Sequence, residues 1–291
     1  MFALVYLTLI YIIGCGELYI GTYNVRSLMG EDRLEELEQE LQSIKWHVIG
    51  LAETRRQGTN IIQLKNGNIL YTVRNESKSE HGVSFLIHRD LASNVIEYKS
   101  SSERVAMVVL RLSKKYSVKI VQVYAPTSAH DDEEIEDMYE EINQLLDSTN
   151  SHYTMVIGDF NAKIGKQRSD ETNVMGKYGI GQRNERGDRL IEFAVSRGLY
   201  IANGKFQKKG NRLWTWRSPD GNTRNEIDFI MTNRPDTIKD VVVMNRVNTG
   251  SDHLLVRCKV DFHTKIERSK LIGKKKLTIN CNELQRKRLE Y

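Results

Sequence analysis

The chain is poor in proline and in cysteine. Its 291 residues include three prolines and three cysteines, with no low-complexity tract and no internal repeat. This composition argues against a disordered or linker-dominated chain. Cys15, Cys258 and Cys281 lie far apart and form no CxxC pair, so neither a disulfide framework nor a cysteine-based zinc site is indicated. Unpaired thiols fit a reducing compartment, and a nuclear or other intracellular location is expected.

The short motifs of two large enzyme classes are also absent. The sequence has no GxxxxGK[ST] phosphate loop and no GxSxG nucleophile elbow. Hydrophobic residues make up 40% of the chain and charged residues 28%, which is typical of a soluble enzyme. The length suits one large α/β domain. We expect a monomer without a small organic cofactor.

An apolar run occupies residues 1–15 and leads directly into an expected core strand at 18–25. The run is shorter than the roughly 20 residues that a membrane-spanning helix needs. It also lacks the basic residues that precede the apolar part of a signal sequence. Residues 1–16 are therefore interpreted as a leader outside the domain. The alternatives are a signal or anchor, which would make the protein secretory or membrane-bound, and an additional core segment.

The positive charge is concentrated at the C-terminus. Residues 262–291 contain nine Lys or Arg and three Asp or Glu, so their net charge is +6. The whole chain has a net charge of +5, so residues 1–261 carry −1. A basic tail favours a polyanionic partner, with Lys274, Lys275 and Lys276 as candidate contacts. A solvated terminus without a partner is the alternative. The expected organisation is one domain over residues 17–261 followed by this tail.

Hydrophobic periodicity predicts many short strands and few long helices. The expected strands are 18–25, 47–52, 69–73, 83–88, 105–112, 117–124, 153–158, 199–202, 213–217, 227–232, 238–246 and 254–260. The expected helices are 32–44, 132–146 and 185–197. Because runs such as 105–112 and 117–124 read as hairpins, the pattern favours mixed sheets packed face to face with helices outside. Residues 163–183 are expected to form a long surface loop.

Polar side chains stand at the ends of several expected strands. Asn24 ends the first strand, and Glu53 follows the apolar run 48–52. In Gly158-Asp159-Phe160-Asn161, alternation in an extended segment would direct Asp159 and Asn161 to one face and Phe160 to the core. Taken alone, Asn24 is compatible with a turn residue and Glu53 with a structural ion pair. The Gly-Asp-Phe-Asn run, by contrast, favours a functional site over a turn.

Two further motifs complete the set. Asp228 lies within an apolar strand, where a carboxylate needs a partner, and Asp252-His253 precedes the last strand. Carboxylates for a hard cation, an Asp/Asn pair and a histidine with a carboxylate to orient it suit metal-assisted phosphodiester hydrolysis. Mg²⁺ is the expected ion, with Mn²⁺ as a substitute.

The order of the motifs NV, LAET, VYAP, GDFNA, IDF and SDH resembles the endonuclease/exonuclease/phosphatase superfamily over residues 18–260. Within that superfamily it is most similar to the apurinic-endonuclease-like domain of LINE retrotransposons of the RTE (BovB) clade. The resemblance implies an α/β fold, a four-layer sandwich with two packed mixed sheets and the active site at one edge. It also implies a DNA-nicking endonuclease that leaves 3′-hydroxyl and 5′-phosphate ends.

The resemblance also implies roles for individual residues. Metal binding is expected at Glu53, Asp252 and Asn24. Catalysis is expected from Tyr124 at the scissile phosphate, Asp159 and Asn161 at the attacking water, and Asp228 through His253. Arg26, Arg55 and Trp216 are expected to contact nucleic acid.

One position departs from the family pattern. Arg26 stands where many apurinic endonucleases have a carboxylate, which weakens the expectation of a second metal or of abasic-site repair. The alternatives left open are an RNase or deadenylase, a lipid or inositol phosphoesterase on the same scaffold, and a non-catalytic DNA- or chromatin-binding protein.

The charge distribution yields a first testable prediction. Deleting residues 265–291 should weaken DNA binding and flatten the plot of log affinity against log salt, by roughly 0.9 for each duplex phosphate that the tail neutralises. Turnover at saturating DNA should stay nearly unchanged, because the deleted segment lies beyond the last motif. Salt titrations of DNA affinity measure the first effect. An unchanged salt slope would show that the tail does not touch DNA.

Overall fold

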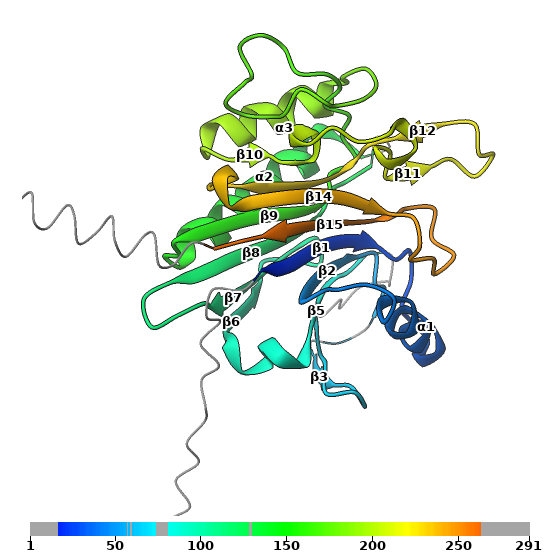
Figure 1. The fold of residues 1–291 in the computed structure, drawn as a ribbon, viewed down its shortest axis with the longest axis vertical. Helices are drawn as coiled ribbons and strands as arrows, with labels where there is room; N and C mark the ends of the chain where they lie inside the picture. The colour runs from blue at the N-terminus through cyan, green and yellow to red at the C-terminus, as the bar shows by residue number, and fades with distance from the viewer. Residues whose placement is uncertain (1–16, 57, 59, 74–80, 128–129, 263–291) are drawn as a thin grey trace, which may run out of the picture.

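The computed structural model describes residues 17–56, 58, 60–73, 81–127 and 130–262. Two large β-sheets pack face to face, with helices on their outer faces (Figure 1). The expected four-layer α/β sandwich is therefore confirmed. The boundaries expected for the leader and the tail stay predictions, because residues 1–16 and 263–291, with Lys274, Lys275 and Lys276, lie outside the described residues. No helix in the described part of the chain is long and apolar enough to cross a membrane.

One sheet has seven strands in the order β14-β15-β1-β2-β5-β4-β3. Their bounds are β1 (Leu18–Asn24), β2 (Val48–Ala52), β3 (Asn60–Gln63), β4 (Ile69–Thr72), β5 (Val83–Ile87), β14 (Ile238–Met244) and β15 (Leu255–Val260). Only β1 and β2 are parallel neighbours here, and the other pairs are antiparallel. Asn24 at the end of β1 is paired with Ala52 at the end of β2.

The other large sheet has six strands in the order β10-β13-β9-β8-β7-β6. Their bounds are β6 (Val95–Ser100), β7 (Val105–Arg111), β8 (Ser117–Tyr124), β9 (Tyr153–Asp159), β10 (Tyr200–Ile201) and β13 (Asp228–Thr232). The expected hairpin of β7 and β8 is confirmed by their antiparallel register. Tyr124 pairs with Asp159 across the parallel strands β8 and β9, and Asp228 pairs with Asp159 from the other side. The polar strand ends of this sheet thus meet at one edge.

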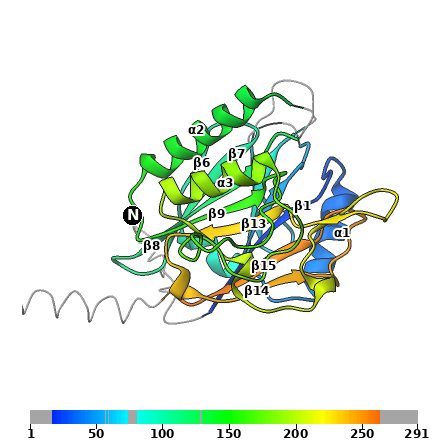
Figure 2. The ribbon, with the colours of Figure 1, turned by 90° about the horizontal axis from the view of Figure 1, so that it is seen from above.

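Three α-helices in the described part of the chain cover the outer faces. Helix α1 (Glu31–Leu41) packs on the seven-stranded sheet, whereas α2 (Asp132–Ser148) and α3 (Glu185–Ser196) lie side by side over the six-stranded sheet (Figure 2). Asp131 and Asn184 cap α2 and α3 by accepting hydrogen bonds from backbone N–H groups of the first turn. Helix α1 ends three residues before the expected Ile44, because residues 42–44 continue with the tighter i to i−3 hydrogen bonds common at helix ends.

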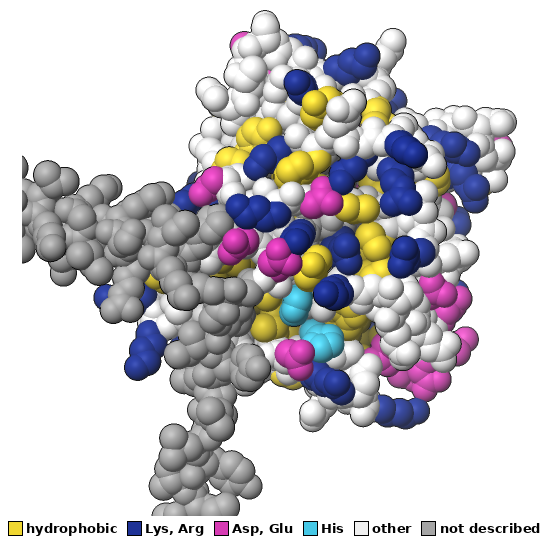
Figure 3. All heavy atoms as spheres, in the orientation of Figure 1, with side chains coloured by type: hydrophobic (Ala, Val, Ile, Leu, Met, Phe, Trp, Pro, Cys, Tyr) yellow, Lys and Arg dark blue, Asp and Glu magenta, His cyan; other side chains and the backbone are white. Residues whose placement is uncertain are grey.

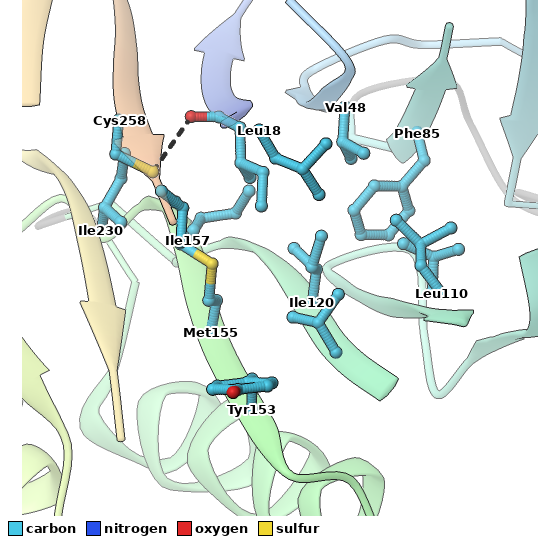
Figure 4. Packing of buried hydrophobic residues seen from close by; sticks show 14 of the residues in the cluster. Leu18, Val48, Phe85, Leu110, Ile120, Tyr153, Met155, Ile157, Ile230 and Cys258 are labelled. Atoms are coloured by element: carbon cyan, nitrogen blue, oxygen red, sulfur yellow. Dashed lines mark hydrogen bonds between the residues drawn. The ribbon is translucent and has the colours of Figure 1, made fainter. Parts of the chain in front are cut away.

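The space between the two sheets is filled by aliphatic and aromatic side chains. Val48 and Phe85 of one sheet point toward Ile120 and Ile157 of the other (Figure 4), and all four are fully buried. Cys258 also lies in this core, so it is a buried free thiol. Removing such a side chain costs about 2–5 kcal/mol in similar cores. This packing fixes how the edges of the two sheets face each other.

A buried lysine joins α2 to the sheet beneath it. Lys119 on β8 is 1% exposed, and its Nζ donates to the carbonyl oxygens of Leu145 (3.0 Å) and Leu146 (2.5 Å) in the last turn of α2. An ammonium group suits the negative end of the helix dipole. Burial lowers the pKa of Lys119.

Three short strands were not predicted from the sequence. They are β3, β6 and β12 (Arg224–Asn225), which pairs with β11 (Trp216–Arg217) in a small hairpin. Strands β3 and β6 end their sheets. The residues of β3 are mostly exposed and those of β6 are partly buried, so neither strand alternates clearly between apolar and polar. The run expected at 213–217 forms strand only at its last two residues. Four 3-10 turns complete the regular structure of the described residues, η1 (Arg89–Asn94), η2 (Asn203–Lys205), η3 (Gly210–Arg212) and η4 (Pro235–Thr237).

Residues 163–183 form a loop without a helix or a strand, as expected, but this loop is not only a surface feature. Ile164, Val174 and Met175 are buried in the core beneath α3. Arg183 and Glu171 form a buried bidentate ion pair, with nitrogen–oxygen distances of 2.5 and 2.7 Å. The paired charges and the apolar anchors hold both ends of the loop near the end of β9.

Candidate active site

The ends of β1, β2, β8 and β9 surround a pocket of about 560 Å³. Trp216 and Asn225 of the β11–β12 hairpin, which is drawn at the right of Figure 1, line this pocket. Nine of the residues predicted for the site line it: Arg26, Glu53, Arg55, Tyr124, Asp159, Asn161, Trp216, Asp252 and His253. Asn24 and Asp228 are buried and hydrogen-bonded to residues of this lining. The structure therefore brings together every predicted site residue that it describes.

The Asn24 side chain connects the two sheets. Its Nδ2 donates to Glu53 Oε1 (2.8 Å) and to Asp159 Oδ2 (3.0 Å). Asn24 and Glu53 follow strands of the seven-stranded sheet, whereas Asp159 ends a strand of the six-stranded sheet. The Asn24 Oδ1 accepts from the backbone N–H of Arg26 (2.9 Å), which fixes the orientation of the amide. Both carboxylates are thereby held by one side chain.

His253 lies between two buried carboxylates. Its Nδ1 is 3.0 Å from Asp228 Oδ2, and its Nε2 is 3.7 Å from Asp159 Oδ2. Because a carboxylate accepts, Nδ1 carries the donated proton. Burial alone would lower the pKa of His253, but the charges of Asp228 and Asp159 outweigh it and raise the pKa to about 10. Burial, followed by the charge of Asp228, raises the pKa of Asp159 to about 7. The expected pairing of Asp228 with His253 is present in the structure.

Tyr124 closes the other side of the pocket. Burial, followed by the charges of Glu53 and Asp159, raises the pKa of Tyr124, so the phenol keeps its proton and can donate a hydrogen bond. The Arg104 guanidinium lies 5.5 Å from the centre of the Tyr124 ring. This cation–π contact holds the ring from behind.

Glu53 and Asp252 are the more accessible carboxylates. Their side chains are 16% and 21% exposed, whereas Asp159 is 1% exposed. Arg55 donates to Glu53 Oε2 (3.1 Å), and Trp216 donates from Nε1 to Asp252 Oδ2 (3.2 Å). Each carboxylate is thus oriented by a residue of the pocket wall and remains open to the pocket.

The backbone around the pocket is strained. Among the described residues, positive φ angles outside glycine occur at Arg26 (61°), Glu53 (51°), Arg55 (52°) and Asn161 (46°). All four residues line the pocket. Non-glycine residues adopt this conformation at a cost, and such strain gathers at functional sites. The left-handed backbone at these positions directs the four side chains away from the strands and toward the pocket.

The conformation of Asn161 differs from the extended one that was predicted from the sequence. Alternation in an extended segment predicted that Asp159 and Asn161 share a face, but Asn161 adopts a left-handed conformation. The two side chains still line the same pocket, because Asp159 Oδ1 accepts from the Asn161 backbone N–H (3.0 Å) and Asn161 Nδ2 donates to the Ala125 carbonyl (2.8 Å). Phe160 is buried as expected.

Four polar residues of the pocket were not predicted. Thr127, Lys163, Asn184 and Asn225 also line it. Within the described part of the chain, the Lys163 ammonium has no carboxylate within ion-pair distance and is available to an anion. Lys163 stands two residues after Asn161, so its place in the Gly-Asp-Phe-Asn-Ala-Lys run could have indicated it. Nothing in the sequence indicates that Asn184 lies at the pocket, because only the course of the long loop brings it close to Lys163. There the backbone N–H of Lys163 donates to Asn184 Oδ1 (2.9 Å).

Comparison with known proteins identifies the class. The model of the endonuclease/exonuclease/phosphatase family matches residues 21–253, and the chain belongs to this family, whose members hydrolyse phosphodiester bonds. The chain is similar to craniofacial development protein 2 of Bos taurus, with 32% identity over 256 residues. The match covers 87% of this chain and 42% of the relative, so the chain spans less than half the length of that protein.

Two solved structures share the fold. The 3′-5′ exonuclease NExo from Neisseria meningitidis matches with a TM-score of 0.63 and 18% identity, over 84% of this chain and 100% of the other. The endonuclease domain of TRAS1, a telomere-specific non-LTR retrotransposon, matches with a TM-score of 0.58 and 14% identity, over 84% of this chain and 99% of the other. At these identities the likeness concerns the fold.

A buried glutamate supports the base of the site. Asn203 Nδ2 donates to Glu226 Oε1 (3.1 Å) and to the backbone carbonyl of Asp228 (2.8 Å). Burial raises the pKa of Glu226 to about 8, from a usual value of 4.5. The folded protein therefore binds this proton more tightly than the unfolded chain does. This tighter binding contributes to the free energy of unfolding. The contribution is fully present below pH 4.5 and is lost as the pH rises toward 8.

We predict that Glu226→Gln removes this pH dependence. Between about pH 5 and pH 8 the Tm of the wild type should fall relative to that of the variant, because the buried carboxyl must ionise or retain its proton at a growing cost. Thermal melts across that range measure the difference. The exposed Glu192→Gln is the matched control and should follow the wild type. Parallel Tm curves for wild type and Glu226→Gln would contradict the prediction.

Proposed function

We propose that the chain is a divalent-metal-dependent phosphodiesterase that nicks DNA. The observation that carries this proposal is the joint position of Glu53, Asp159 and His253 in one pocket, with Asn24 and Asp228 holding them from beneath. Such a site offers a ligand for a cation, an acceptor for a proton from water, and a donor toward a phosphate oxygen. These are the groups that metal-assisted cleavage of a phosphodiester needs.

The residues of the pocket fit Mg²⁺ or Mn²⁺. Glu53, Asp252 and the Asn24 side-chain oxygen are hard oxygen donors, which these ions prefer. Asp159, Asp228 and His253 also lie close enough together to be considered as ligands, with ligand atoms within 4.8 Å of one another. We assign the ion to Glu53 and Asp252 instead, because Mg²⁺ keeps several waters and these two carboxylates are the more exposed. Bound there, the ion would neutralise charge on the phosphate oxygens.

The buried groups supply the proton transfers and the hydrogen bonds. Asp159 would accept a proton from the attacking water, which the Asn161 side chain would help to orient. His253, held by Asp228, would donate toward the phosphate and stabilise the charge that develops on it. Tyr124 would donate from its phenol to a phosphate oxygen. The products would be a 3′-hydroxyl and a 5′-phosphate.

Nucleic acid is the substrate that the rim of the pocket favours. Arg26, Arg55 and Lys163 line the pocket, and Trp216 adds an aromatic surface. Cations bind the phosphates on either side of a scissile bond, and an aromatic ring can stack on a base. The fold shared with nucleases supports the same substrate class, and the likeness to the TRAS1 endonuclease domain supports an endonuclease of the LINE type.

Glu53→Gln tests the metal assignment. The substitution keeps the size of the side chain and its bond from Asn24 but removes the charge. Mg²⁺-dependent nicking of supercoiled plasmid should fall by at least about 100-fold, since metal-supported charge neutralisation contributes several kcal/mol. Mn²⁺ binding by the purified protein should weaken in parallel. Wild-type nicking by Glu53→Gln would show that the carboxylate does not hold the ion.

Asp228→Asn is the comparison variant in the same experiment. It removes the carboxylate that holds His253 and leaves Glu53 and Asp252 in place. Turnover should slow by orders of magnitude while Mn²⁺ affinity changes little, because Asp228 acts through the imidazole. A large loss of metal affinity in Asp228→Asn would instead place the ion among Asp159, Asp228 and His253.

A further inference from the structure

Most of the described arginines are paired with carboxylates, including Arg33, Arg56, Arg104, Arg183 and Arg189. A minority have no carboxylate within ion-pair distance among the described residues, and these are Arg111, Arg212, Arg217, Arg224, Arg246 and Arg257. Arg217 and Arg224 lie on the β11–β12 hairpin beside the active-site pocket. Three others, Arg212, Arg246 and Arg257, surround a second hollow.

This second hollow, which we call the basic groove, lies on the outer face of the seven-stranded sheet where α1 does not cover it. Its volume is about 570 Å³. Lys45, Arg212, Arg246 and Arg257 line it, and no carboxylate does. Figure 3 shows this side of the molecule, where Lys and Arg side chains, with some Asp and Glu among them, are spread over the face formed by β14, β15 and β1. Four cations without a carboxylate in the lining would attract an anion.

Arg257 is held in place at the floor of the groove. Its guanidinium lies 4.8 Å from the centre of the Tyr19 ring, and its Nη1 donates to the backbone carbonyl of Lys45 (2.7 Å). These contacts orient the guanidinium but do not neutralise it. Arg212 and Arg246 are exposed at the rim, where they are free to move toward a ligand.

Two segments of the chain that line the groove also lead to the active-site pocket. Arg212 ends η3, four residues before Trp216 of the pocket. Arg246 lies near the start of the segment that leads from β14 to Asp252 and His253. The two segments are joined where Asn245 Nδ2 donates to the Asn211 carbonyl (3.4 Å). The same two segments therefore carry residues of the basic groove and residues of the active-site pocket.

We propose that the basic groove binds backbone phosphates of the nucleic acid beyond the bond that is cut. The choice of nucleic acid as ligand rests on the proposed function. Its phosphates repeat along the strand, so one molecule can occupy the pocket and the groove together, and a guanidinium can grip each phosphate with two hydrogen bonds. An acidic protein segment is the competing ligand, and the two segments that the groove shares with the pocket favour nucleic acid.

The test compares two double variants of the full chain. Arg212→Gln/Arg246→Gln neutralises two cations of the groove rim, and both side chains are exposed and unpaired, so the fold should persist. Lys114→Gln/Lys115→Gln is the matched control: it makes the same change in charge at the exposed β7–β8 turn, at the opposite end of β8 from Tyr124. Thermal melts check that both variants remain folded.

Affinity for a long duplex is measured in EDTA over a range of salt concentrations. The groove variant should lower the slope of log affinity against log salt by about 1.8, or roughly 0.9 for each of two phosphates, and the control should match the wild type. A slope equal to that of the wild type would overturn the proposal, and so would an equal reduction in both variants. Weaker polyglutamate binding with unchanged DNA binding would also overturn it, because the groove would then be a protein-docking surface.

Nicking of supercoiled plasmid by the wild type separates this proposal from the proposed function. If the wild type nicks DNA and the groove variant keeps the wild-type salt slope, only the groove assignment fails. If the wild type does not nick DNA but the groove variant alone has a reduced salt slope, the groove assignment stands and the proposed nuclease activity fails.

Discussion

The site depends on one amide that joins the two sheets. Asn24 donates to Glu53 on its own sheet and to Asp159 on the opposite sheet, at 2.8 and 3.0 Å. The polar groups of the pocket are divided between the sheets in the same way. Asp159, Asp228 and Tyr124 come from the six-stranded sheet, whereas Glu53, Asp252 and His253 flank strands of the seven-stranded sheet. The geometry of the site is therefore set by the packing of one sheet on the other.

A second polar bridge lies deeper between the sheets. Thr22 Oγ1 donates to Gln122 Oε1 (3.1 Å), and both residues are completely buried. Gly50 makes room for this bridge, because a Cβ at that position would lie 1.9 Å from Gln122 Oε1. Buried polar groups are costly when unpaired, so two such bridges restrict how the sheets can slide or rotate. The apolar core supplies the driving force for packing, and the bridges specify the alignment that the site requires.

Much of the fold and the site could be predicted from the sequence, because both depend on periodic patterns of apolar and polar residues. Buried strands such as β2 and β9 are apolar runs that stop at polar residues, and parallel or paired strand ends meet at one edge of a sheet. Glu53, Asp159 and Asp228 could be identified for this reason. The edge strands β3 and β6 could not, since their residues are only partly buried and do not alternate clearly between apolar and polar.

The rest of the site depends on three-dimensional features that leave no pattern in the sequence. The left-handed backbone at Arg26, Glu53, Arg55 and Asn161 is imposed by the surrounding contacts, because none of these residues is a glycine. Asn184 reaches the pocket only because the loop from residue 163 to 183 returns to its starting point. The basic groove likewise combines residues from the end of α1, η3, β14 and β15, whose proximity is a product of sheet order.

In the proposed reaction, this arrangement of residues cuts a phosphodiester so that the 3′ oxygen leaves and the phosphate stays on the 5′ side. The most direct measurement incubates the purified wild-type chain with supercoiled plasmid and Mg²⁺ and then treats the relaxed product with DNA ligase. We predict nicked circles that ligase seals, since sealing requires a 3′-hydroxyl next to a 5′-phosphate, and we predict no nicking in EDTA. Nicks that ligase cannot seal, nicking that persists in EDTA, or a plasmid that stays supercoiled would contradict the proposed reaction.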